Sequence, residues 1–361
     1  MVNIFGGSKS GRLAGLEIST SSVKLVELSG DGGGYRVERF AVEAMPRGAV
    51  VDGNIADIEA VGGAIHRMAR RIGCSRDVAV ALPSSQVITK RILLSANLRE
   101  FEMEAQAEAE AGQIIPFSLD EVNLDFQVLG PSAASSQDVD VLIAAARKDK
   151  VQNVVDAVEA GGLNAVIVDS ESFAMESAFS LVSRKLFGRD KSWISALVDI
   201  GASGTKVTFL QNGKQIYFRE QQIGGNQLTQ EIVNRYGLSQ DEAEADKVSG
   251  QLPDGYEQEV LRPFCDLLAM EVSRAMQFFF TSTNYDEVDR IVVSGGCAQL
   301  PGLIDAIRAR TEKNDGSQVE TVVANPFASM SLASGVRFNN LLAAAPSLMV
   351  ACGLALRRFD A

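Results

Sequence analysis

The sequence predicts an α/β protein built from two similar halves, with a smaller α+β module inserted into the first half. Residues 16–28 and 198–210 share Ile, Ser, Lys and Leu at four of thirteen positions, with an acid at the second position of each. In both halves a turn rich in glycine or containing Asn-Gly is followed by renewed apolar alternation, which is typical of hairpins. The alternative is a chance likeness between two strand–turn–strand segments.

The composition indicates a soluble globular chain. Its 361 residues are about 2.4 times a typical 150-residue domain. Hydrophobic residues make up 46% and charged residues 22%. The net charge of −12 argues against binding to nucleic acid and against direct insertion into an anionic membrane surface. The single histidine, His66, excludes a two-histidine metal site and leaves one candidate for a Ser-His-Asp triad.

The cysteines and the apolar segments favour a cytoplasmic protein with reduced thiols. The four cysteines form no CxxC pair, which excludes zinc ribbons and thioredoxin-type chemistry. The N-terminal segment lacks the apolar core of a secretory signal. The most apolar run, residues 341–356, is interrupted by Pro346 and Gly353, so we expect a buried helix rather than a membrane span.

Periodicity assigns the elements of the first half in order. Apolar residues recur every three or four positions over residues 55–72, which predicts an amphipathic helix. Strands are expected at 78–82, 87–94, 122–129, 139–146 and 165–168, and helices at 99–113 and 149–160. The strand–helix–strand–strand–helix–strand order that begins with the strand at 87–94 indicates an inserted module, which we place at residues 78–168.

The second half contains three consecutive helices and a further strand-to-helix turn. Helices are expected at 227–236, 240–250, 263–281, 304–311 and 346–357, and a strand at 290–293. We therefore expect a first lobe over 1–77 and 169–195, the inserted subdomain over 78–168, and a second lobe over 196–226 and 289–340. A second-lobe subdomain would cover 227–288, and residues 341–361 would form a closing helix on the first lobe.

The repeated segment has the residue types that bind phosphate. In each copy an acid is followed by small residues and, seven positions after the acid, by a lysine; small residues let backbone N–H groups approach a phosphate, and the lysine adds charge. The candidate residues are Ser19, Thr20, Ser21, Ser22 and Lys24 in the first copy and Gly201, Ala202, Ser203, Gly204 and Lys206 in the second. Glu17 and Asp199 could hold Mg²⁺ through water. The alternative for each loop is an ordinary turn between strands.

Two further features could contribute to such a site. A buried strand runs into Gly295 and Gly296 before a helix, which suits close packing against an adenine or phosphate, although a structural turn has the same pattern. Asp169 and Glu171 follow another buried strand. They could orient an attacking water, or they could cap the helix that begins near residue 172.

Taken in this order and spacing, the loops resemble the actin-like ATPase superfamily, with its ribonuclease H-like, two-lobe fold. Residues 13–24 and 197–206 resemble its two phosphate motifs, and 291–302 its adenosine motif. Within the superfamily the chain resembles the PilM family of type IV pilus assembly proteins over nearly its whole length. The inserted module, residues 114–117, the segment 227–250 and the ending 347–357 carry this likeness.

The resemblance implies ATP and Mg²⁺ in a cleft between two lobes. It adds Gly224, Gly225, Asn226, Glu244, Lys247, Cys297 and Leu300 to the candidate nucleotide contacts. It also implies binding of the N-terminal cytoplasmic peptide of PilN, an inner-membrane protein, and a role in the PilN/PilO/PilP assembly platform, pilus biogenesis and twitching motility. The protein would then be cytoplasmic and held at the inner membrane by its partner. Contact with pilus motor ATPases and weak homo-oligomerisation are compatible with the resemblance.

Two departures from the superfamily pattern affect the expected activity. Glu17 stands where aspartate is usual and Ser19 where glycine is usual. We therefore expect ATP binding with slow or absent hydrolysis. The alternatives are a small-molecule kinase of the same superfamily and a filament-forming protein like FtsA. Apolar residues around 87–94 and 114–117 are candidates for the peptide groove, with core packing as the alternative.

Overall fold

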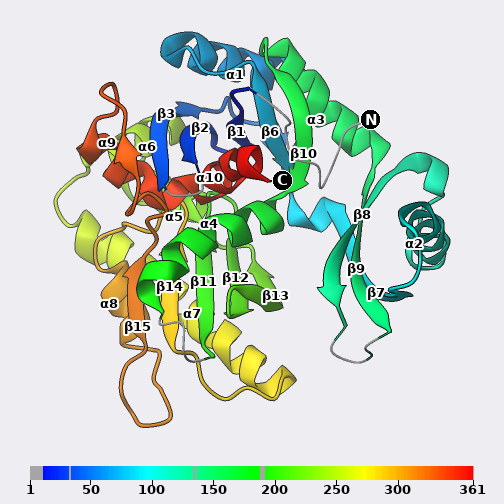
Figure 1. The fold of residues 1–361 in the computed structure, drawn as a ribbon. Coiled ribbons are helices and arrows are strands. Elements are labelled where there is room, and N and C mark those ends of the chain that lie inside the picture. Colours follow the sequence, from blue (N-terminus) through cyan, green and yellow to red (C-terminus); the bar gives the residue numbers. More distant parts are fainter. Residues whose placement is uncertain (1–10, 32–33, 133–134, 136, 188–191, 361) are drawn as a thin grey trace. The chain divides into compact units, whose positions relative to one another are not determined.

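The computed structural model describes residues 11–31, 34–132, 135, 137–187 and 192–360, and the chain divides into two compact units (Figure 1). Unit 1 comprises Met1–Ser177, Met330–Val336 and Val350–Ala361. Unit 2 comprises Ala178–Ser329 and Arg337–Met349. Each unit contains its own central sheet.

The sheet of unit 1 begins with an antiparallel meander and continues with parallel strands. Its order is β10-β6-β1-β2-β3-β16. The meander consists of β1 (Ala14–Ile18), β2 (Ser22–Asp31) and β3 (Gly34–Ala44), and β6 (Asp77–Leu82) and β10 (Asn164–Ser170) extend the sheet in parallel from β1. The short β16 (Ser331–Leu332) pairs with β3.

The sheet of unit 2 repeats this plan. Its order is β13-β12-β11-β14-β15, again an antiparallel meander followed by two parallel strands. The strands are β11 (Ile194–Ile200), β12 (Thr205–Gln211), β13 (Lys214–Gln221), β14 (Arg290–Ser294) and β15 (Glu320–Val323). The registers agree: Glu17 lies opposite Lys24, and Asp199 lies opposite Lys206. The internal repeat is therefore a structural one.

Helix α1 (Ile58–Ile72) covers the unit 1 sheet and begins three residues later than the apolar period suggests. Asp57 caps it by accepting a hydrogen bond from the N–H of Ala60, and Ile55 belongs instead to the two-residue strand β5 (Asn54–Ile55). The helix ends at Gly73, whose φ of 60° few other residues adopt readily. Its apolar face packs with α3 (Lys148–Ala160) and the sheet into one core, which includes Ile65, Met68 and Val158.

Only residues 87–147 of the predicted inserted module form a separate body, a three-stranded antiparallel sheet with a helix on one face (Figure 1), because β6, α3 and β10 at the two ends of the predicted range belong to the sheet and core of unit 1. The order is β7 (Val87–Ser95), β9 (Asp138–Arg147), β8 (Val122–Pro131), and α2 (Glu100–Ile114) packs against it through Ala107 and Ala111. Successive strand residues face opposite sides. Ile92 and Leu94 therefore face α2, whereas Leu93, which is 51% exposed, projects from the other face.

The core of unit 2 lies between its sheet and its helices. These helices are α5 (Gly225–Tyr236), α6 (Gln240–Ser249), α7 (Arg262–Ser282) and α8 (Leu303–Arg308). The ring of Phe279 on α7 stacks on Phe209 of β12 with 4.1 Å between ring centroids, and Tyr217 of β13 contacts both rings. Each fully buried phenylalanine contributes about 1.5–3 kcal/mol of burial free energy.

The C-terminal helical segment is apolar and mostly buried. Phe338–Phe359 is the one run among the described residues that is long and apolar enough to cross a membrane, but 61% of its apolar window is buried. Within unit 1, a Cβ at Gly353 of α10 (Met349–Leu356) would lie 1.8 Å from the carbonyl oxygen of Ala174 on α4 (Glu171–Leu186). A Cβ at Gly15 would lie 2.1 Å from that of Ala351. Glycine permits this close packing, which is typical of a core helix.

Candidate functional site

The turn at residues 201–204 joins β11 to β12 and presents backbone donors. The N–H of Gly201 donates to the carbonyl oxygen of Gly204 at 2.9 Å and closes the turn. Among the described residues no hydrogen bond occupies the N–H groups of Ala202, Ser203 and Gly204. Successive N–H groups in such a turn form a concavity suited to an anion. This observation fits the expected phosphate contact of the second copy.

The start of α5 is packed onto that turn. The N–H groups of Gly225 and Asn226 donate to the carbonyl oxygens of Gly201 and Ala202 at 2.9 and 2.8 Å. A Cβ at Gly224 would lie 2.6 Å from the carbonyl oxygen of Gly201 and 2.7 Å from that of Ala202. Only glycine fits at this position, because the neighbours are backbone atoms. The helix start therefore holds the turn in shape.

The loop after β14 also contacts the 201–204 turn. Gly295 has a φ of 93°, and its Cβ would meet the carbonyl oxygen of Ile200 at 2.3 Å. The N–H of Cys297 donates to that same oxygen at 3.2 Å, and its thiol lies 3.9 Å from the carbonyl oxygen of Gly201. Burial raises the pKa of Cys297 to about 11, so the thiol is protonated at neutral pH.

Two other residues of this loop differ in their surroundings. A Cβ at Gly296 would meet no atom within 4 Å, so the space beside it is open. Leu300 packs against the unit 2 core, and its N–H donates to the carbonyl oxygen of Cys297. Gly296 therefore lies beside accessible space, whereas Leu300 anchors the loop.

A polar network on α5 and α6 borders the same loops. Nζ of Lys247 donates to Oγ1 of Thr229 at 2.7 Å and forms an ion pair with Glu244 at 2.6 Å. Thr229 also donates to the carbonyl oxygen of Gly225 at 3.0 Å. The Lys247 side chain is only 14% exposed, so its charge is held close to the start of α5. The sequence analysis did not single out Thr229, although its position four residues after Gly225 on one helix was a usable signal.

The two predicted Mg²⁺ acids have different partners. Asp199 accepts a hydrogen bond from Oγ of Ser294 at 3.0 Å, a contact that the sequence analysis missed. Glu17 forms an ion pair with Lys24 at 2.5 Å, with side chains 10% and 12% exposed. The described residues contain no cluster of three or more His, Cys, Asp and Glu that could hold a metal ion directly.

The first turn, at residues 19–22, is stabilised by its own hydroxyls. The N–H and Oγ of Ser19 both donate to the carbonyl oxygen of Ser22, at 3.0 and 2.9 Å. Ser21 accepts a hydrogen bond on its carbonyl oxygen from the N–H of Met45. Among the described residues no hydrogen bond occupies the N–H groups of Thr20 and Ser21. The N–H of Ser19 closes this turn as the N–H of Gly201 closes the other, so the Thr20 and Ser21 N–H groups are the donors that this turn can offer.

Asp169 and Glu171 lie at the end of β10 and the start of α4. The Asp169 side chain is 1% exposed, with its Oδ2 3.3 Å from Nε of Arg357, and its Oδ1 accepts the N–H of Ser170 at 2.7 Å. Burial raises the pKa of Asp169 to about 6, although Arg357 and the N–H of Ser170 oppose the shift. Glu171 is the first residue of α4 and is partly exposed. The proposed water-orienting roles of both acids stay predictions.

The repeated meander, the phosphate-type turns and the glycine contacts define the class: an actin-like ATPase fold. A solved structure of the ethanolamine utilization protein EutJ from Carboxydothermus hydrogenoformans shares this fold at 17% identity, with a TM-score of 0.55, over 98% of this chain and 92% of that one. The chain belongs to the type IV pilus assembly protein PilM family, whose model matches residues 15–359.

A second solved structure is much more similar. It is described as the PilM-PilN type IV pilus biogenesis complex, and the alignment covers 97% of this chain and 99% of that one at 27% identity, with a TM-score of 0.76. The predicted fold and the predicted family are therefore both confirmed.

Proposed function

We propose that this protein is an ATP-binding scaffold of the type IV pilus assembly platform and that it binds the N-terminal cytoplasmic peptide of PilN. The observation that carries the proposal is the likeness to the PilM-PilN complex over 97% of the chain. PilN binding would hold the acidic, cytoplasmic protein at the inner membrane through its partner. The wider roles in the PilN/PilO/PilP platform and in twitching motility are part of the same proposal.

The residues of unit 2 fit the triphosphate and nucleoside of ATP. The N–H groups of residues 202–204 would donate to phosphate oxygens, and Lys206 would add positive charge. The open space beside Gly296 would take the nucleoside, and the Lys247 network would border it. Asp199 would hold Mg²⁺ through water; when bound, the ion neutralises charge on the phosphates. The family resemblance alone assigns the 19–22 turn to the same nucleotide.

We further propose that hydrolysis is slow because of the first turn. Glu17 is committed to Lys24 in a nearly buried ion pair, so recruiting either side chain to Mg²⁺ or phosphate would break that pair. Breaking a buried pair costs about 3–5 kcal/mol. A barrier increase of that size slows a reaction by roughly two to four orders of magnitude. ATP would then stabilise the protein as a bound ligand rather than serve as a substrate for hydrolysis.

The peptide site is proposed on the inserted module. Leu93 is 51% exposed on the face opposite α2, and Phe117 is 38% exposed beneath the guanidinium of Arg147. Exposed apolar side chains of this kind are suitable anchors for an apolar peptide. Both lie in the segments 87–94 and 114–117 that the sequence analysis singled out.

A binding experiment tests the scaffold proposal. The full-length protein is titrated with a fluorescent peptide of the PilN cytoplasmic tail, in parallel with a scrambled peptide. We expect saturable binding of the native sequence only, weakened at least tenfold by Leu93→Asn. The matched control is Val248→Asn, at an apolar residue of unit 2 that is 78% exposed. Equal binding of both peptides would refute the PilN assignment, and an unaffected Leu93→Asn would refute the proposed surface.

A further inference from the structure

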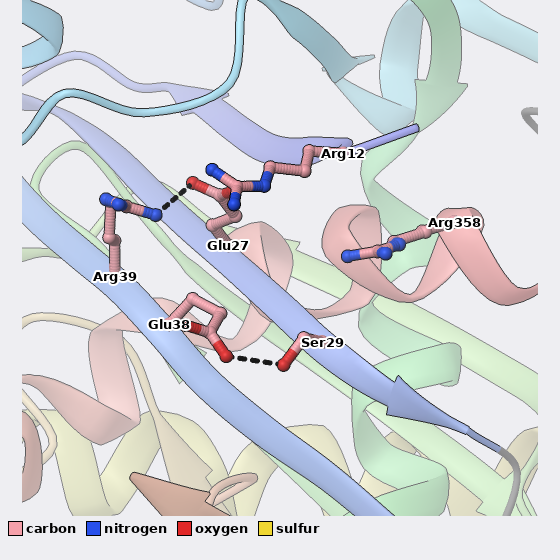
Figure 2. Close-up of a pocket in the computed structure, with 6 residues that line it drawn as sticks. All are labelled: Arg12, Glu27, Ser29, Glu38, Arg39 and Arg358. Carbon is pink, nitrogen blue, oxygen red and sulfur yellow. Dashed lines mark hydrogen bonds and ion pairs between the residues drawn. The ribbon is translucent and has the colours of Figure 1, made fainter. Parts of the chain in front are cut away.

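Unit 1 contains a polar pocket at the end of the sheet opposite the 19–22 turn. Glu17 at the turn end of β1 pairs with Lys24, whereas Glu27, which lines the pocket, pairs with Ala14 at the start of β1. The pocket has a volume of about 160 Å³. Figure 2 shows its lining side chains, which come from β2, β3, the residues before β1 and the C-terminal turn: Arg12, Glu27, Ser29, Glu38, Arg39 and Arg358.

The internal repeat shows that the fold does not need charges at this place. Glu27 and Arg39 occupy the positions that Phe209 and Tyr217 occupy in unit 2, and a β-bulge follows Glu27 and Phe209 alike. In unit 2 the two rings pack at 5.8 Å and belong to the apolar core. Unit 1 instead buries a glutamate with only 1% of its side chain exposed. Burying such a charge is expensive unless it is paired, and Glu27 is paired with Arg39 at 3.3 Å, so unit 1 keeps a charged site where unit 2 has an apolar core.

The bulge brings a second acid into the pocket. Glu38 is the extra residue that β3 inserts between Val37 and Arg39, so it lines the pocket together with Arg39 rather than alternating with it. Its carboxylate accepts a hydrogen bond from Oγ of Ser29 at 2.5 Å. Glu27 accepts hydrogen bonds from Arg39 and from the N–H of Ser75, both at 3.3 Å. Both carboxylates therefore have partners within the protein.

The three arginines that line the pocket have more N–H donors than their contacts within the protein use. Arg358 uses one nitrogen for the carbonyl oxygen of Leu28, at 2.7 Å, and Arg39 uses two, for Glu27 and for the carbonyl oxygen of Ile72. Among the described residues no ion pair or side-chain hydrogen bond occupies the guanidinium of Arg12. Each guanidinium carries five N–H donors. The pocket thus combines three arginines with two carboxylates, a net charge of +1, and a surplus of donors.

We propose that this pocket binds a carboxylate group of a small ligand, held between Arg12 and Arg358. The guanidinium fork matches a planar carboxylate with two parallel hydrogen bonds. A singly charged anion balances the net charge, whereas a phosphate dianion would be repelled by Glu27 and Glu38. The carboxylate can belong to a free amino acid or to the last residue of a peptide. Within unit 1 the pocket lies at the other end of the sheet from the 19–22 turn, and the proposal does not depend on nucleotide binding.

Calorimetric titration of the full-length protein tests this site. The probes are N-acetylglycine, which mimics a peptide C-terminus, glycine, and inorganic phosphate, all at constant ionic strength. We expect at least one of the two carboxylates to bind, and to bind about tenfold more weakly in Arg12→Gln and in Arg358→Gln. Arg70→Gln, at an exposed position in the last turn of α1, is the matched control and should leave binding unchanged.

The outcomes separate the sources and the alternatives. Tighter binding of N-acetylglycine assigns the site to a peptide end, and tighter binding of glycine assigns it to a free amino acid. Phosphate binding more tightly than both, or carboxylate binding that Arg12→Gln leaves unchanged, would overturn the proposal. Arg12 is exposed, so its variant keeps the test valid if Arg358→Gln unfolds the C-terminal turn. Circular dichroism spectra and melting temperatures equal to those of the parent show that the variants are folded.

Discussion

Gly224→Ala should damage the candidate nucleotide site through a single methyl group. The new Cβ would lie 2.6, 2.7 and 2.8 Å from the carbonyl oxygens of Gly201 and Ala202 and the nitrogen of Gly204. These distances are about 0.6–0.8 Å shorter than the 3.4 Å at which ordinary contact begins, and backbone atoms cannot rotate away. The 201–204 turn must therefore move.

The expected cost follows from the size of the clash. Overpacking of this kind costs about 1–3 kcal/mol, and each kcal/mol lowers the melting temperature of a unit this size by roughly 2–4 °C. We expect the free energy of unfolding of unit 2 to fall by that amount and ATP affinity to fall at least tenfold. Urea denaturation and calorimetric titration with Mg²⁺ and ATP measure the two effects.

Gly296→Ala provides the matched control at a second glycine of the site. Its Cβ would meet no atom within 4 Å, so the free energy of unfolding should stay within about 0.5 kcal/mol of the parent. ATP affinity should still fall, because the methyl group occupies space proposed for the nucleoside. Full ATP affinity in both variants would refute the reasoning, since the two glycines would then lie outside any nucleotide site.

Three further predictions concern charged and reactive side chains. Burial raises the pKa of Asp169 from 3.8 to about 6, so the folded state binds a proton more tightly than the unfolded state. As pH rises from 4 to 6, the free energy of unfolding should therefore fall by up to about 3 kcal/mol. Asp169→Asn should remove that difference in denaturation curves, and an unchanged pH dependence would contradict it. Glu17→Gln should lower the free energy of unfolding by about 3 kcal/mol, because it leaves Lys24 unpaired. Adding Lys24→Met to that variant should restore part of the loss. Additive losses in a double-mutant cycle would contradict the pairing. Cys297 should react with iodoacetamide at pH 8 more slowly than in the unfolded chain, because burial raises its pKa to about 11. ATP with Mg²⁺ should slow the reaction further. Equal rates with and without nucleotide would argue against a nucleotide site near Cys297.

The sequence predicted the repeat and its loops because both depend on local patterns. A tight turn between two strands sets the register, so an acid and a lysine seven residues apart had to become cross-strand neighbours. The pattern could not show that Glu17 and Lys24 pair with each other, since that depends on side-chain length and on what lies beside them. The start of α1 was placed three residues early because the apolar period continues through Ile55 into a short strand.

Long-range contacts account for what sequence reasoning missed. Arg358 reaches the carbonyl oxygen of Leu28 across 330 positions, and no local pattern joins it to Glu27 or Arg12. Likewise, Ser294 became a partner of Asp199 only because β14 pairs in parallel with β11. The sequence repeat already places Phe209 at the position of Glu27. That one of these positions belongs to an apolar core and the other to a charged pocket became clear only from the packing within each unit.

Identification of the nucleotide that copurifies with the protein tests the central claim most directly. The purified full-length protein is denatured, and the released nucleotide is identified and quantified against the amount of chain. We predict ATP at close to one molecule per chain, because the loops bind nucleotide and hydrolysis is slow. ADP alone would contradict slow hydrolysis. No nucleotide, even after incubation with ATP and Mg²⁺, would contradict the nucleotide site itself and leave a scaffold that recognises its peptide without ATP.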